Sequence, residues 1–552
     1  MKRLLLLLLI GVLLALSTPV LAQTATVDPA SYLPADTPLY AETRTDSTGL
    51  SDNDQIVNFG QQLLNPGQPT LPSSILLGGI SDLLPGIDIT TDVLPWLGDH
   101  VGIAAMSLDD TASQIVVLPV HDASGALAFI TKATAGVTPE AVAGVNLYTT
   151  STASLLVGGN VIWLGAPTAI SQFVKTPMLA RLSDNPQYQQ VRAALPANAD
   201  SILYASPAYV AGVLASSPAA SSSVALFQAG LRLHPAQSAA EDALLQSPAL
   251  NGMGLAFQMT GSNLQMTGAL SVNTQYPAPT LPNASAGTAL IHLIPGNSFF
   301  VVDSYDLATA AVPLLEVALS GTPITSEFHA LVGGAETTLP ATPSPAAPIT
   351  ADALVTQFQP LITQVTSLSG LPLDQFYSLI DGEYAVAVFP GAGPIVGAAL
   401  YLQSSDPQQI IDALDHASHL ILINPVSGQQ LMNVDHGTVS GTPITYISVP
   451  NIADRFALGV IDKNVLFVTQ ESTLQPVLDA AQKQTPTSPA VSAISAFDAG
   501  QEALFYADPR TIDLYNLREQ RTPPLPMTAV AGSVDVQGNG LFLLHLTVTM
   551  AS

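Results

Sequence analysis

An internal repeat constrains the fold of this chain more than any other feature of its sequence. Four short blocks occur twice, in the same order, along the 552 residues: 33–40 with 294–301, 97–104 with 380–387, 160–164 with 464–468, and 202–207 with 504–509. Four blocks rarely recur in one order by chance, and self-similarity of this kind indicates a repeat architecture. The sequence therefore predicts a tandem duplication, with a first repeat over residues 23–285 and a second over residues 286–552.

Each predicted repeat closes on a hairpin pattern. The first hairpin covers residues 254–272 and turns at Gly261, and the second covers residues 532–550 and turns at Gly538. Earlier in each repeat, strand-like apolar alternation leads into helical patterns, and Asp122 is placed to cap one of these helices. Neighbouring strands joined by short polar turns form antiparallel pairs. We therefore predict an α+β fold, a tandem duplication of a mostly antiparallel sheet with helices packed on one face.

Two proline-rich stretches mark breaks in this pattern. Residues 276–282 contain three prolines and cannot continue a helix or a central strand, so they are expected to join the two repeats. Residues 339–348 contain four prolines and have no counterpart in the first repeat. This second stretch is predicted to be an extended loop.

The N-terminus has the pattern of a secretory signal peptide. Lys2 and Arg3 precede an apolar run over residues 4–16, and Val20 and Ala22 place small residues before a cleavage site. A retained anchor would need about 20 apolar residues, and no later run of the sequence is long enough to span a bilayer. We expect a signal peptide over residues 1–22, cleavage after Ala22, a secreted or extracytoplasmic protein, and no transmembrane segment after cleavage.

The charge balance is strongly acidic, with 41 Asp and Glu against 14 Lys and Arg and a net charge of −27. This field argues against binding to nucleic acid or to anionic lipid, and it favours a soluble monomer. Most carboxylates cannot find a basic partner within the chain. We therefore expect stability to hold or rise from about pH 7 to about pH 4.5. The chain has no cysteine, which excludes disulfides and thiolate chemistry.

One cluster of residues has the composition of a metal site. Its members share one predicted helix at spacings of three and four residues, so they lie on one helical face: Asp412, Asp415, His416 and His419. The same residues fit a solvated face opposite Ile411. This second interpretation is favoured, because the matching helix of the first repeat, residues 126–133, contains no histidine. No cofactor is expected.

Three further patterns have structural explanations. The oxygen-rich residues 46–54 lack the spacing of a calcium loop, and a turn that caps the next helix is favoured. The glycine-rich residues 391–397 precede a predicted strand rather than a helix, which favours a hairpin turn over a dinucleotide loop. Trp96 and Trp163 are expected in the core. The sequence shows no nucleophile elbow, and a catalytic triad assembled in space stays open.

Residues 32–41 read Tyr-Leu-Pro-Ala-Asp-Thr-Pro-Leu-Tyr-Ala and lie between the predicted signal peptide and a long acidic α+β chain. In this motif and layout the chain resembles the bacterial exported proteins of the domain of unknown function 3352 family. The resemblance implies an extracytoplasmic location. It brings no established activity and no site residues.

The sequence favours a function without catalysis. A duplicated scaffold without a catalytic pattern predicts an exported protein that binds a protein partner or a cell-envelope component. Two alternatives stay open, an extracytoplasmic hydrolase with an unrecognised site and a carrier of an apolar small molecule in a cleft between sheet and helices.

Overall fold

The computed structural model describes about three fifths of the chain, in segments separated by gaps. The described residues are 28–64, 80, 83–106, 113–142, 144–176, 178–209, 250–272, 290–305, 370–380, 382–391, 396–421, 433–449, 454–483, 490, 493, 503–514, 527–537 and 541–550. The predicted signal peptide, the proline-rich junction and the loop at 339–348 lie outside these segments.

The described strands form one continuous antiparallel sheet of twenty strands. The first half contributes β1 (Leu39–Arg44), β2 (His100–Ala105), β3 (Gln114–Pro119), β4 (Glu140–Val142), β5 (Val145–Thr149), β6 (Ser154–Gly158), β7 (Val161–Gly165), β8 (Ser201–Ala205), β9 (Leu250–Thr260) and β10 (Asn263–Val272). The second half contributes β11 (Phe300–Tyr305), β12 (Glu383–Pro390), β13 (Val396–Gln403), β14 (Asn433–Val439), β15 (Thr442–Ser448), β16 (Phe456–Ile461), β17 (Asn464–Val468), β18 (Ala503–Ala507), β19 (Met527–Gln537) and β20 (Leu541–Met550).

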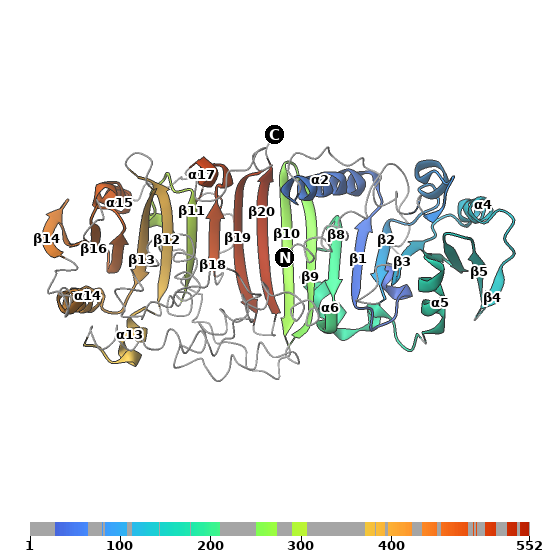
Figure 1. Cartoon of the computed structure of the whole chain (residues 1–552), viewed down its shortest axis with the longest axis horizontal. Helices are drawn as coiled ribbons and strands as arrows, with labels where there is room; N and C mark the ends of the chain where they lie inside the picture. Colours follow the sequence, from blue (N-terminus) through green and yellow to red (C-terminus); the bar gives the residue numbers. More distant parts are fainter. Residues whose placement is uncertain are drawn as a thin grey trace, which may run out of the picture.

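The two halves have the same strand order. In the first half it is β4-β5-β6-β7-β3-β2-β1-β8-β9-β10. In the second half it is β14-β15-β16-β17-β13-β12-β11-β18-β19-β20. The two orders meet where β10 pairs with β20, with Thr267 opposite His545. Each half therefore runs outward from the centre of an elongated molecule, and β4 and β14 lie at opposite ends (Figure 1).

The strand registers also correspond. Leu39 on β1 lies opposite Ala105 on β2 and Ala205 on β8. Phe300 on β11 lies opposite Val388 and Ala507 on the equivalent strands. Residues 39 and 300 occupy the same place in the repeated sequence blocks, as do 205 and 507. The sequence blocks and the strand pairings therefore identify the same equivalent positions.

Helices flank the sheet along its length. The longer ones are α2 (Ser47–Leu64), α4 (Ala123–Ala133), α5 (Pro167–Lys175), α6 (Pro186–Ala194), α13 (Leu373–Ile380), α14 (Pro407–Ile421), α15 (Leu474–Lys483) and α17 (Pro509–Leu514). The short turns are η1 (Pro29–Tyr32), η2 (Ile89–Val93), η4 (Leu182–Asp184), η7 (Ile291–Leu293) and η8 (Glu471–Thr473). None of the described helices is long and apolar enough to cross a membrane.

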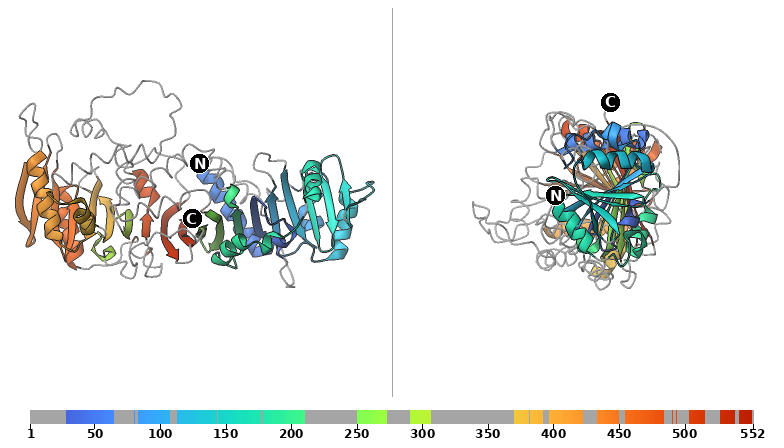
Figure 2. Two further views of the ribbon diagram at one scale, coloured as in Figure 1. Left: turned by 90° about the horizontal axis from the view of Figure 1, so that it is seen from below. Right: turned by 90° about the vertical axis from the view of Figure 1, so that its right-hand side faces the viewer.

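The helices cover both faces of the sheet, which corrects the expectation of helices on one face. On β3, Ile115 and Val117 enter a core with α5 and α6, whereas Val116 and Leu118 enter a second core with α4 and η2. Figure 2 shows helices above and below the sheet in the end-on view. The reason is that this strand has apolar side chains at successive positions, so each of its faces needs cover.

The second half repeats this layering. The core on one face includes side chains of α15 and η7, and the core on the other face includes side chains of α13 and α14. A further cluster lies at the centre of the molecule, where β10 pairs with β20. Here α2 packs on strands of both halves, including Met527 and Val548. The two halves thus share a sheet and a core at the centre.

Several local expectations are confirmed. The first closing hairpin turns at residues 261–262, and Gly261 has a positive φ of 63°. Asp46 accepts backbone N–H bonds from Thr48 and Gly49, at 3.1 Å and 3.0 Å, so a carboxylate of the oxygen-rich stretch does cap a helix. Residues 47–54 are, however, the first turns of helix α2 itself and not a turn before it, which corrects that part of the expectation. Trp96 is buried in the core on the α4 face.

Candidate functional site

The candidate site is built on helix α14, which begins after a capping carboxylate. Asp406 accepts the backbone N–H of Gln409 at 3.1 Å, and Pro407 occupies the first helical position, where its missing N–H costs nothing. Ile410 and Ile411 are buried against the sheet. Because of the 3.6-residue period, Gln408, Asp412 and Asp415 then lie along one side of this apolar stripe.

A hairpin forms the opposite wall of the site. Strands β14 and β15 are joined by Ser440 and Gly441, both with positive φ, which is the conformation that two-residue hairpin turns require. The register places His436 on β14 opposite Thr445 on β15, and Thr445 opposite Leu458 on β16. These three side chains form a row on the face that α14 covers.

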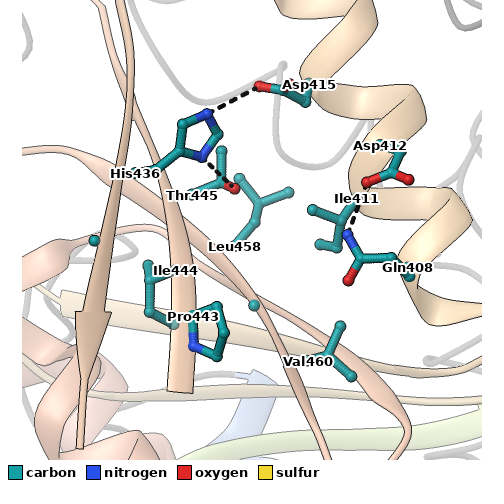
Figure 3. A pocket seen from close by; sticks show the side chains of 12 residues that line it. Gln408, Ile411, Asp412, Asp415, His436, Pro443, Ile444, Thr445, Leu458 and Val460 are labelled. Atoms are coloured by element: carbon teal, nitrogen blue, oxygen red, sulfur yellow. Dashed lines mark hydrogen bonds and ion pairs between the residues drawn. The ribbon is translucent and has the colours of Figure 1, made fainter. Parts of the chain in front are cut away.

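A pocket of about 230 Å³ lies between this helix and the hairpin (Figure 3). Its floor is apolar and its rim carries two carboxylates and one imidazole; neither Lys nor Arg is among its lining residues. The lining residues are Gln408, Ile411, Asp412, Asp415, His436, Gly437, Pro443, Ile444, Thr445, Leu458, Gly459 and Val460.

Polar contacts position the groups at the rim. His436 Nδ1 and the Thr445 hydroxyl share a hydrogen bond of 3.3 Å, and His436 Nε2 lies 3.8 Å from Asp415 Oδ1. Gln408 donates its amide N–H to Asp412 at 2.7 Å. The His436 side chain is 63% exposed, so solutes can reach the rim. Both carboxylates thus face the pocket mouth from α14 (Figure 3).

The structure brings together only part of the predicted metal cluster. Asp412 and Asp415 line the pocket, but His416 is exposed on α14 and is not part of the lining, and the side chain of His419 lies outside the described residues. Among the described side chains, no group of three or more His, Asp or Glu residues could hold a metal ion. Metal binding that involves His419 therefore stays a prediction.

Sequence reasoning missed His436, the histidine that does lie at this site. It is 21 residues after Asp415 and comes from a strand, so helical spacing could not find it. The signal that could have found it is the short strand pattern on either side of the Ser440-Gly441 turn. That pattern predicts the hairpin, although it does not predict which helix the hairpin faces.

A second group of ionisable residues lies deep in the second half, on the face opposite to α14. Asp303 on β11 and Glu383 on β12 are 3% and 0% exposed. Burial and the neighbouring Glu383 carboxyl raise the pKa of Asp303 to about 8. Glu383 accepts the backbone N–H of Leu290 at 3.0 Å. Because both side chains are buried, a ligand in solution does not reach this pair, and we treat the pair as structural.

The first half has different chemistry at the equivalent positions. Glu42 on β1 lies 3.7 Å from His100 and accepts the Tyr40 hydroxyl at 3.1 Å. Burial raises the pKa of Glu42, and His100 opposes that shift. Tyr188 and Tyr204 pack edge to face beside them, with ring centroids 5.2 Å apart. Aromatic packing closes this cluster.

Comparison with known proteins identifies a family for this chain, and that family is one of unknown function. The profile of the family described as "Protein of unknown function (DUF3352)" matches residues 3–535, and the chain belongs to this family. No curated protein matches the chain. Solved structures of TP0453 resemble it weakly. Crystal form I has 12% identity and a TM-score of 0.22 over 45% of this chain and 80% of that one. Crystal form III has 11% identity and a TM-score of 0.22 over 45% and 82%. Scores this low carry no argument.

Proposed function

We propose that the protein is an exported, non-enzymatic binding protein, and that the pocket between α14 and the β14–β16 strands receives a cationic side chain of its partner. The observation that carries the proposal is an open pocket with an apolar floor, two carboxylates at its rim, and neither Lys nor Arg in its lining. A cationic head on an apolar stem satisfies both parts of such a site.

The size of the pocket favours a side chain as its occupant. At about 230 Å³ it is smaller than the roughly 300–1,000 Å³ of sites for drug-sized ligands. The methylene stem of a Lys or Arg would contact Ile411 and Leu458, and its charge would reach Asp412 and Asp415. These carboxylates are partly solvated, so the electrostatic gain is modest and the isolated side chain binds weakly.

A test uses two small probes that share one stem. The cationic probe is Nα-acetyl-lysine methylamide, and the neutral probe is the norleucine analogue, with binding followed by saturation-transfer NMR. We expect the cationic probe to bind more tightly and the double variant Asp412→Asn with Asp415→Asn to lose it. Asp36→Asn, which neutralises an exposed carboxylate of the first half, is the matched control. Equal binding of the two probes would favour the carrier of apolar molecules instead.

One observation favours hydrolysis as a second candidate function. Thr445, His436 and Asp415 form a hydroxyl–imidazole–carboxylate chain, the arrangement of a catalytic triad. The two distances of 3.3 Å and 3.8 Å are longer than activated triads use, and Thr445 is 8% exposed, which favours binding over catalysis. Hydrolysis of p-nitrophenyl acetate that is lost in Thr445→Val would support the enzyme.

Export and duplication complete the proposal. Export is supported by the basic, apolar and small-residue segments of residues 1–22, and mass spectrometry of secreted protein should find Gln23 as the first residue. The duplication into residues 23–285 and 286–552 is supported by the common strand order and by the matching registers at Leu39 and Phe300. An experimental structure with different strand orders in the two halves would contradict it.

A further inference from the structure

Strand β14 is the outermost strand of the second half, at one end of the sheet (Figure 1). Within the described chain it pairs with β15 alone. The residues that close a two-residue hairpin exchange both backbone hydrogen bonds, and the bonding then alternates along the strand. Since Val439 and Thr442 close this hairpin, the backbone N–H and C=O groups of Val434, His436 and Thr438 are directed away from β15.

Among the described residues, this edge has few of the devices that commonly prevent strand addition. Proteins commonly shorten an edge strand, interrupt it with a bulge, or place Lys or Pro on it. Strand β14 has seven residues, contains no Lys or Pro, and keeps an unbroken register from Asn433 to Val439. The strand in the equivalent place at the other end, β4, has three residues. Of the two outermost strands that the structure describes, β14 is therefore the better template for another strand.

The outer edge of β14 and the pocket adjoin each other. His436 belongs to both, since its backbone lies on the edge and its ring lines the pocket. A strand added beside β14 would lie about 4.8 Å away, and the side chain opposite His436 would project from the same face of the sheet. Asp415 lies on that face, 3.8 Å from the His436 ring. A long side chain at this place of the added strand could reach the carboxylates.

Charge decides between the kinds of strand that could be added. The chain carries 41 acidic and 14 basic residues, so a second copy would bring like charge to a rim that already holds Asp412 and Asp415. A basic segment of another protein would be attracted to the same rim. Charge complementarity therefore selects a different protein as the occupant.

We propose that β14 is the docking edge for an extended segment of a partner protein, which adds a strand to the sheet and places one Lys or Arg side chain in the adjoining pocket. Backbone hydrogen bonds to Val434, His436 and Thr438 supply affinity, and the pocket supplies specificity. This inference rests on the proposed function of the pocket and extends it from a single side chain to a strand.

The test uses a labelled seven-residue probe of alternating Thr and Val with one central Lys, measured by fluorescence anisotropy. We expect it to bind at least tenfold more tightly than Nα-acetyl-lysine methylamide. Thr438→Pro removes one outward N–H from the edge without changing a residue of the pocket, and it should return the affinity of the peptide to that of the small probe. Thr438→Val keeps the N–H and should bind the peptide as the unmodified protein does.

A peptide with N-methyl groups on its pairing edge gives the same information without changing the protein. It should lose the tenfold advantage even if Thr438→Pro fails to fold. If the small probe binds and the peptide binds no more tightly, the docking edge is wrong and the pocket proposal stands. If neither probe binds, both proposals fail. A dimer that forms without peptide and is abolished by Thr438→Pro would identify a second copy as the occupant and overturn the inference.

Discussion

The two halves of the molecule have the same strand order and the same register at their centres, but they differ in chemistry where those strands carry polar residues. At the outer ends, α4 and β4 in the first half correspond to α14 and β14 in the second. Near the middle of each half, Glu42 and His100 correspond to Asp303 and Glu383. One strand arrangement thus supports different local chemistry, and topology alone does not define function.

The outer ends show how a few residues create a site. Counted from the capping residues Asp122 and Asp406, Leu127 and Ile411 occupy the same helical position. Leu127 is 64% exposed, whereas Ile411 is 8% exposed and lines the pocket. The longer β14–β15 hairpin of the second half accompanies this difference. The pocket wall on α14 therefore corresponds to an exposed helix face on α4.

The largest effect that we expect concerns the buried acids and tests the difference between the two centres. Because the pKa of Asp303 is raised in the folded state, the stability that it contributes is full below about pH 4 and is lost as the pH rises through about 8. The Asp303→Asn variant has no carboxyl group at this position, so it lacks this titration. As the pH rises from 5 to 8.5, the free energy of unfolding of the variant should therefore rise relative to that of the wild type by a few kcal/mol, measured by chemical denaturation.

The matched change in the first half is Glu42→Gln. His100 and Arg192 both lower the pKa of Glu42 against the effect of burial, so its pH dependence should be smaller than that of Asp303. If the free energy of unfolding depends on pH in the same way in Asp303→Asn and in the wild type, Asp303 does not carry a raised pKa in the folded state. The direction agrees with the sequence-based expectation that stability holds or rises from about pH 7 to about pH 4.5.

The next effect tests the difference between the two ends. Ile411→Ala removes buried methyl groups and should lower the free energy of unfolding by about 2 kcal/mol, at the low end of such changes because the site borders a pocket. Leu127→Ala, at the equivalent exposed position, should change it by less than about 0.5 kcal/mol. Thermal or chemical denaturation of both variants checks this. Equal costs would mean that the two helix faces are packed alike.

The smallest effect concerns a buried polar network that holds α2 on the first half. The Ser201 hydroxyl donates to Asn53, whose amide donates to Thr43 at 2.8 Å, and all three residues are buried. The second half has Ala503 where the first has Ser201. Ser201→Ala should therefore cost about 1–1.5 kcal/mol, since the Asn53 oxygen loses its donor.

Ser378→Ala is the matched control for this change. It removes an exposed hydroxyl that bonds to the Gln375 carbonyl, and it should cost less than about 0.5 kcal/mol. If both serines cost the same in denaturation experiments, the Asn53 network adds nothing to the attachment of α2.

Local sequence patterns predicted several elements of the fold and indicated which positions of the two halves are equivalent. Apolar alternation, turn residues and capping carboxylates act over a few neighbouring residues, so they predicted the first closing hairpin and a helix cap within residues 46–54. The repeated blocks placed Leu39 and Phe300 in equivalent positions, and the strand registers agree with that alignment. The family membership was also recognisable, because the opening motif at residues 32–41 is local.

Contacts between residues that are distant in sequence depend on the tertiary structure. Asp303 and Glu383 are 80 residues apart, and Asp415 meets His436 rather than His416 because the hairpin folds over α14. Helices cover both faces of the sheet, because apolar strands such as β3 need cover on each side. Local periodicity tells which side chains share a face, but what lies against that face depends on loop lengths and on packing between distant segments. The pocket is formed by such packing, because its lining residues come from α14 and from strands β14 to β16.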